Sequence, residues 1–424
     1  MKNGNVRKLG LLEESPHGRE RAIALLLFLC SAVATFGLLP ALFPRSNAEV
    51  RPDRSTPVAI GEAYSIGAPP LEPIRHDYNI HDVRSAVREG VRWLAAHQFP
   101  EGVWDNRRYV LLCRDAVCPG QGSANLSTGV TALSLSALLH AYELDRGRTD
   151  VTELEDAIRR GLSWIMTVQD IDGCFAQTRD DRSIYGHAIA TAVMAKAFVL
   201  LDDVEYRRAA IRGARFLEMS RTPDSGWGYA IRSSRCDTSV TGWAVQALLE
   251  CRAAGIDIRP EALEGAKRWV ERVTDTRYFD TAYDRAGRGQ SFLKNTNDRF
   301  LPNEAMTATG LSLRRGIGEE DAATAIREGT ARLARDLPVW NARGTSIDYY
   351  YWFHGTLAIN ALSENDGLRR RWNDAVTTIL LTNQEKEHAA CRKGSWGAVD
   401  KWSPIGGRVY AVAMNLLTLM KANF

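Results

Sequence analysis

The feature that most constrains the fold of this chain is an internal repeat of roughly fifty residues. Each copy has an alanine, a glycine four residues later and, in most copies, an aromatic residue followed by Leu or Ile. The clear copies begin at Ala86, Ala157, Ala209 and Ala325, and weaker ones surround Trp269 and run from Trp372 to Leu381. Around the first copy, valines and arginines alternate with helical period, which is typical of an amphipathic helix. We therefore expect one surface helix in every repeat.

The segments between these copies are small and apolar on every side, which is typical of buried helices. They cover Ser127–Tyr142, Ile184–Leu201, Asp237–Cys251, Asn303–Leu313, Tyr349–Leu362 and Arg408–Met420. Six surface helices that alternate with six buried ones predict an all-α domain over residues 80–424, an α/α toroid of about six helix pairs in two concentric rings. A superhelical solenoid of helix pairs stays open as an alternative.

The loops after the surface helices share a second motif, a Gln followed by a Gly and then an aromatic residue. Its members are Gln98, Gly102 and Trp104, then Gln169, Gly173 and Phe175, then Gly226 and Trp227, and finally Gly394 and Trp396 after Gln384. A Gln amide can bridge backbone groups, a Gly permits a tight turn and an aromatic ring can pack on the next helix. We interpret these residues as structural staples.

This motif resembles the QxxxGxW repeat of squalene and oxidosqualene cyclases, and residues 80–424 resemble the superfamily of terpenoid cyclases and protein prenyltransferases, which are α/α toroids. The resemblance implies a DxDD motif whose aspartic acid protonates an isoprenoid double bond. Here only Asp237 and Thr238 remain, and Cys236 takes the place of the donor. A thiol with a pKa near about 8.5 is too weak an acid for that step.

The prenyltransferase side of the resemblance implies a zinc ion held by an Asp-x-Cys pair and a His. Asp237 is followed by Thr238 and Ser239, so one ligand is missing. We therefore predict no cofactor and no metal, and a zinc site that includes Asp237 and His354 stays open as the less favoured alternative.

The remaining candidates for a site lie where the buried helices begin. We predict that Asp237, His187 and His354 form a proton-transfer site, because a His beside a carboxylate holds its proton near neutral pH. The predicted cavity wall consists of Arg235, Cys236, Tyr185, Tyr349, Tyr350 and Tyr351. The alternative is that Asp237 is a helix cap and both histidines are hydrogen-bonded core residues.

The N-terminal part predicts a membrane anchor. The uncharged run from Ala22 to Phe43 is long enough to span a bilayer, and basic residues concentrate before it, so residues 1–21 are expected in the cytoplasm. A cleaved signal peptide is the alternative. We expect residues 44–75 to form a Pro- and Gly-rich tether and the main domain to lie outside the cytoplasm. In an oxidising compartment Cys113 and Cys118 are the best candidates for a disulfide, and two free thiols are the alternative.

Taken together, these patterns predict a membrane-anchored, extracytoplasmic toroid that binds an apolar or isoprenoid-like ligand. A non-catalytic ring for protein contacts and a carbohydrate-active lyase or hydrolase are the alternatives, so the sequence leaves open whether the chain is an enzyme. The 54 Lys and Arg against 51 Asp and Glu leave a net charge of +3 without a basic tract. This charge distribution argues against a nucleic-acid partner.

Overall fold

The computed structural model describes residues 78–424 except 115–116, 146–151, 178–182, 224, 287–303, 321–322, 341–346, 363–365 and 387–390. The predicted cytoplasmic segment, membrane helix and tether lie outside these residues. Among the described helices, one is apolar and long enough to cross a membrane by length and composition alone, Ile184–Leu201, and 61% of it is buried inside the protein. It is one of the predicted buried helices of the toroid.

The described residues of the compact unit Leu71–Phe424 are helical and contain no strand, only two isolated β-bridges. The amphipathic helices are α2 (Ile80–Ala96), α4 (Thr152–Thr167), α6 (Val204–Ser220), α8 (Pro260–Val273), α10 (Thr324–Leu333) and α12 (Asp366–Asn383). The helices that are apolar on most sides are α3 (Ser127–Leu144), α5 (Ile184–Leu201), α7 (Thr238–Ala253), α9 (Glu304–Gly316), α11 (Tyr349–Asn360) and α13 (Ser403–Asn423). A short 3-10 helix, η1 (Tyr109–Leu112), follows α2.

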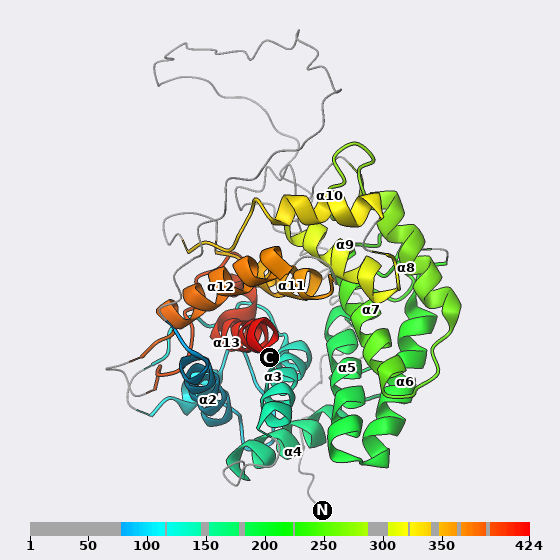
Figure 1. Ribbon diagram of the computed structural model, residues 1–424. Helices are drawn as coiled ribbons and strands as arrows, with labels where there is room; N and C mark the ends of the chain where they lie inside the picture. The colour runs from blue at the N-terminus through cyan, green and yellow to red at the C-terminus, as the bar shows by residue number, and fades with distance from the viewer. Residues whose placement is uncertain are drawn as a thin grey trace, which may run out of the picture. The chain divides into compact units, whose positions relative to one another are not determined.

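The second set of helices forms a closed inner ring. Each contacts the next in the order α3, α5, α7, α9, α11 and α13, and α13 packs back against α3, beside which it lies in Figure 1. The outer helices pack on this ring from outside, and α12 also contacts α2. The predicted all-α toroid of six helix pairs is confirmed, and the open solenoid is excluded because the last pair meets the first.

The Gln, Gly and aromatic residues of the loops join neighbouring repeats at three junctions of the described ring. The side-chain amide of Gln98 donates to the carbonyl of Gly102 in its own loop and to that of Ala157 in the next outer helix, both at 2.9 Å. Gly102 has a φ of 101°, and a Cβ there would lie 2.1 Å from the carbonyl oxygen of Arg160. Only glycine fits such a contact in this backbone conformation.

The same geometry recurs around the ring and closes it. Gln169 donates to Ala209 at 2.9 Å, and Gln384 in the last repeat donates to Ala86 in the first at 2.8 Å. Each acceptor is the alanine that opens the fifty-residue repeat. The Gln of the loop motif therefore donates the hydrogen bond, and the alanine of the outer-helix motif accepts it.

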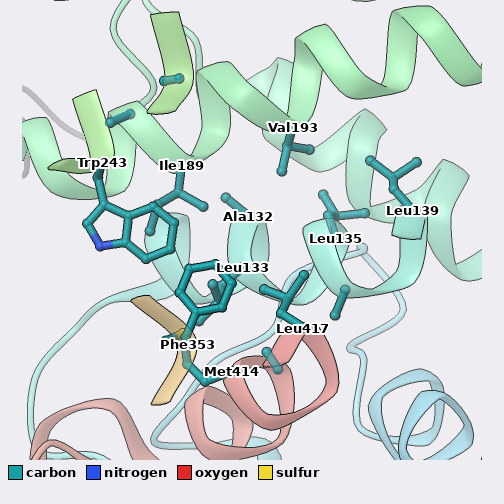
Figure 2. Packing of buried hydrophobic residues seen from close by; sticks show 14 of the residues in the cluster. Ala132, Leu133, Leu135, Leu139, Ile189, Val193, Trp243, Phe353, Met414 and Leu417 are labelled. Carbon is teal, nitrogen blue, oxygen red and sulfur yellow. The ribbon is translucent and has the colours of Figure 1, made fainter. Parts of the chain in front are cut away.

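The centre of the inner ring is filled with side chains. Figure 2 shows Leu133, Ile189, Trp243, Phe353 and Met414 pointing toward one another from five inner helices. The rings of Trp243 and Phe353 stack with centroids 5.6 Å apart, and both residues are buried. An elongated ligand cannot pass through this part of the ring without displacing them.

Candidate functional site

Asp237 is the residue of the predicted site that most clearly lies at the mouth of the ring, where the inner helices begin. It caps α7: its Oδ1 accepts hydrogen bonds from the backbone N–H of Val240 at 2.8 Å and from the hydroxyl of Ser239 at 2.6 Å. Burial raises the pKa of Asp237 to about 6, and hydrogen bonds, first that of Ser239, oppose the shift. The cap and a carboxyl group that titrates near neutral pH are therefore properties of the same residue.

Three tyrosines around Asp237 form what we call the tyrosine mouth: Tyr185, Tyr229 and Tyr283. The rings of Tyr185 and Tyr229 stack with centroids 6.2 Å apart, and the hydroxyl of Tyr283 donates to that of Tyr229 at 3.5 Å. The indole N–H of Trp243 donates to the hydroxyl of Tyr185 at 2.8 Å, which links the mouth to the packed centre. Tyr229 is 41% exposed, so the mouth reaches the surface.

His354 lies below this mouth, on the same face of α11 as Tyr350, one helical turn away. Its ring centroid is 4.3 Å from that of Tyr350 and 5.3 Å from that of Trp243. Its Nε2 is buried without a hydrogen-bond partner among the described residues, and burial lowers the pKa of His354 to about 3. His354 is therefore neutral at ordinary pH, contrary to the charged His expected beside a carboxylate.

His187 does not join the mouth. Its Nδ1 accepts from the backbone N–H of Phe175 at 3.1 Å, and its Nε2 lies 3.0 Å from the carbonyl oxygen of Gly213 in α6. The ring thus points outward between α5 and α6, where it ties the backbone of two neighbouring repeats. The predicted grouping of Asp237, His187 and His354 is not formed, because His187 is a hydrogen-bonded core residue.

Of the three consecutive tyrosines predicted to line one cavity, each faces a different part of the protein. Tyr350 faces His354, while the hydroxyl of Tyr349 donates to Gly397 and that of Tyr351 to Asp336. Successive residues of a helix point about 100° apart, so three consecutive tyrosines cannot share one wall.

The two residues before Asp237 also differ from expectation. Cys236 is buried against Trp269 and Val273 of α8, so the side chain in the place of the cyclase acid packs on an outer helix. Arg235 is exposed and forms an ion pair with Asp284 at 3.4 Å. Cys236 is therefore not a wall of the mouth.

A second buried carboxyl group was missed from the sequence. Burial raises the pKa of Asp400 to about 7, and its carboxylate accepts from the backbone N–H of Ser403 at 2.9 Å. Neighbouring Asp348 caps α11 and pairs with Lys401 at 2.8 Å. Asp400 lies eight residues before Arg408, where the buried helix was expected to begin, so no helix-start pattern in the sequence pointed to it.

One group of side chains could hold a metal, and it lies between the first and last repeats. It consists of His97, Cys113, Cys118 and Cys391, whose ligand atoms all lie within 4.8 Å of one another. The expectation that the chain has no metal ligands is therefore corrected, because these four side chains are a metal-ligand set. Cys113 and Cys118 are free, so the predicted disulfide is not formed, and both sulfur atoms face Nε2 of His97. Sequence spacing suggested only the nearby cysteine pair, because Cys391 is 294 residues from His97.

A charged hollow of about 550 Å³ lies elsewhere on the described surface, lined by residues that include Glu218, Arg221, Asp257 and Arg259. None of the predicted site residues lines it. The mouth and the His97 cluster are therefore the two candidate sites.

The sequence matches no protein-family model and no curated protein. In structure the chain is similar to a type II terpene cyclase from Scytonema, with 14% identity, a TM-score of 0.54 and coverage of 82% of this chain and 99% of the cyclase. A variant of that cyclase is known in complex with its substrate, geranylgeranyl dihydroxybenzoate.

Two carbohydrate-active structures are similar to a comparable degree. An alpha-1,6-mannanase from Salegentibacter has 14% identity, a TM-score of 0.53 and coverage of 80% of this chain and 98% of its own. An alpha-amylase from Clostridium perfringens has 10% identity, a TM-score of 0.52 and coverage of 80% and 97%. These similarities show the fold, a toroid shared by terpenoid and carbohydrate enzymes.

Proposed function

We propose that this chain is a membrane-anchored, extracytoplasmic toroid that binds an apolar, isoprenoid-like ligand at the tyrosine mouth without cyclising it. The observation that carries the proposal is the stacked pair of Tyr185 and Tyr229, which is partly exposed beside a buried carboxyl group. Aromatic rings provide apolar contact area, and their hydroxyl groups give a ligand orientation.

The packed centre limits where such a ligand can bind. Because Trp243 and Phe353 fill the ring below Tyr185, the ligand would lie at the mouth instead of inside the ring. A substrate carrying a geranylgeranyl group is bound by the Scytonema cyclase of the same fold. This supports an isoprenoid group as the first ligand to test.

Two features argue against proton-initiated cyclisation. Cys236, in the place of the acid, packs on α8, and Asp237 uses its carboxyl group to accept hydrogen bonds from Ser239 and Val240. Protonation of an alkene needs a strong acid. Burial raises the pKa of Asp237 to about 6, which makes its carboxyl group a weaker proton donor than an ordinary aspartic acid. Binding is therefore the function that the geometry supports.

The test measures binding of geranylgeraniol to the full chain in lipid nanodiscs, with empty nanodiscs as the partition control. We expect Tyr229→Ala to weaken binding about tenfold, because loss of one aromatic contact costs about 1.4 kcal/mol. Because Tyr229 also stacks on Tyr185 and accepts from Tyr283, the binding of each protein is compared well below its measured melting temperature.

The matched control is Tyr278→Ala, which removes a 61% exposed tyrosine outside the mouth. Equal affinity of both variants and the wild type would contradict the proposal. Tight binding of alpha-1,6-mannotetraose with no binding of geranylgeraniol would favour the carbohydrate alternative instead.

The anchoring part of the proposal has its own measurement. Protease added to spheroplasts should cleave between residues 44 and 75 and leave an N-terminal tag protected. Complete protection of the chain without detergent would place the domain in the cytoplasm and reject the proposed orientation.

A further inference from the structure

Four side chains that bind soft metals converge where the ring closes. His97 ends α2 in the first repeat, Cys113 and Cys118 follow in the loop toward α3, and Cys391 comes from the loop between α12 and α13 in the last repeat. His97 and Cys118 are buried, and Cys113 and Cys391 are partly exposed. The other described cysteines, Cys174, Cys236 and Cys251, are buried and belong to no such group.

The distances within this cluster fit a tetrahedral site. Nε2 of His97 lies 3.7 Å from Sγ of Cys113, 3.8 Å from Sγ of Cys118 and 3.4 Å from Sγ of Cys391. Bonds of about 2.3 Å to sulfur and about 2.0 Å to nitrogen at tetrahedral angles place N and S about 3.6 Å apart. Nε2 of His97 therefore already lies at about the distance from each sulfur atom that a shared Zn²⁺ requires, and all four ligand atoms lie within 4.8 Å of one another.

The hydrogen bonds of His97 leave the correct nitrogen available. Its Nδ1 lies 2.8 Å from the carbonyl oxygen of Trp93, which can only accept, so Nδ1 carries the proton. Nε2 then has a free lone pair directed at the three sulfur atoms. The ring is also held between Trp93, with centroids 4.1 Å apart, and Tyr109 at 5.9 Å. These contacts with Trp93 and Tyr109 fix the orientation of the imidazole ring, as the hydrogen-bond partners of metal-bound histidines do.

The surroundings also suit the charge of such a site. Three thiolates and one Zn²⁺ carry a net charge of −1, and the buried guanidinium of Arg408 lies close by, where it donates to the carbonyl of Pro119 at 2.8 Å. The backbone N–H of Cys118 donates to Sγ of Cys113 at 3.3 Å, which stabilises a thiolate. The hydroxyl of Tyr109 holds the loop by donating to the backbone carbonyl oxygen of Cys118 at 2.8 Å.

From these contacts we infer that His97, Cys113, Cys118 and Cys391 bind one Zn²⁺ that clamps the last repeat of the toroid to the first. Three thiolates and one imidazole favour Zn²⁺ over Mg²⁺ or Ca²⁺, which take oxygen ligands. All four positions are filled by protein, which is the arrangement of a structural zinc site and leaves no place for a substrate. The site is separate from the inner-helix position at which prenyltransferases hold zinc.

The test uses the full chain purified without added chelator, with metal content measured by mass spectrometry. We expect one zinc per chain, and X-ray absorption should show three sulfur neighbours at about 2.3 Å and one nitrogen at about 2.0 Å. This measurement needs no variant, so it stands even if a substitution prevents folding. A chain without zinc that contains a Cys113–Cys118 disulfide in non-reducing peptide maps would overturn the inference.

Variants then assign the ligands. Cys391→Ala should lose at least nine-tenths of the bound zinc and lower the melting temperature, although Cys391 is only partly buried. Cys251→Ala removes a fully buried thiol of α7 outside the cluster, and it should keep one zinc per chain even if packing loss lowers its stability. Retention of full zinc by Cys391→Ala would overturn the assignment of this ligand and of the clamp between repeats.

Discussion

At the scale of single residues, burial decides the protonation of the groups that the mouth contains. Asp237 and His354 both lie in surroundings that disfavour charge, so the pKa of the carboxyl group rises to about 6 and that of the imidazole falls to about 3. Both groups are neutral at slightly acidic pH. An ion pair between a His and a carboxylate, expected from the residue types, is therefore not the state that this environment favours.

The raised pKa of Asp237 makes a prediction about stability. A carboxyl group whose folded pKa exceeds its unfolded value stabilises the fold fully below pH 3.8, and this contribution is lost as pH rises through about 6. Each pKa unit corresponds to about 1.4 kcal/mol, and part of the effect is already lost at pH 4, so the wild type should lose about 2.5 kcal/mol relative to Asp237→Asn between pH 4 and pH 8. Asn keeps a cap oxygen for Val240 and Ser239.

The measurement is urea unfolding of both proteins across this pH range. Comparing the two cancels His354, which contributes with the opposite sign because its pKa is lowered. A constant difference in the free energy of unfolding from pH 4 to pH 8 would show that Asp237 has an ordinary pKa.

At the scale of elements, the outer helices α2, α6 and α12 are each tied to the following loop by a tryptophan. The indole N–H of Trp104 donates to the carbonyl of Leu94 near the end of α2, at 2.8 Å, and the side chain is fully buried. Trp227 and Trp396 make the same bond to Leu217 and Leu380. The ring thus fills the junction and caps one of the carbonyl groups that a helix end leaves without a partner.

Substitutions at Trp104 should separate these two roles. We expect Trp104→Ala to lower the free energy of unfolding by about 3–5 kcal/mol, because it leaves a cavity in the core. Trp104→Phe should cost only about 1–2 kcal/mol, since Phe175 fills the equivalent place in the second repeat without an N–H group. Chemical denaturation measures both, and an unchanged midpoint for Trp104→Ala would contradict the packing role.

At the scale of the whole ring, closure depends on contacts between the two ends of the chain. Gln384 donates to Ala86 at 2.8 Å, and the side-chain amide of Asn106 donates to the carbonyl of Ile405 at 3.0 Å. The same Gln contact joins neighbouring repeats elsewhere, as in Gln169 to Ala209. The junction of the last repeat with the first, which we call the seam, therefore uses the same Gln-to-Ala hydrogen bond as other junctions between neighbouring repeats.

Because the same Gln-to-Ala hydrogen bond occurs at the seam and within the ring, its removal should cost a similar free energy of unfolding at both places. Gln384→Ala at the seam and Gln169→Ala within the ring each remove two hydrogen bonds donated by the side-chain NH2 group, so each should lower the free energy of unfolding by about 2 kcal/mol. Gln169→Ala also loses an exposed hydrogen bond that the side-chain oxygen of Gln169 accepts from Arg212, which adds little. In an open solenoid Gln384 would not contact Ala86. A neutral Gln384→Ala beside a destabilised Gln169→Ala in denaturant titrations would contradict closure.

The six helix pairs and the staple residues such as Gln98 and Trp104 could be predicted from the sequence, because a local period encodes each helix and the staple motif recurs in four loops. The directions in which the polar side chains of the inner helices point depend on the packing of the whole ring. A helix that is apolar all round has no preferred face, so nothing nearby in the sequence shows that His187 turns toward Gly213. The meeting of His97 with Cys391 was also decided by the fold, because ring closure brings residues 294 positions apart to within 3.4 Å.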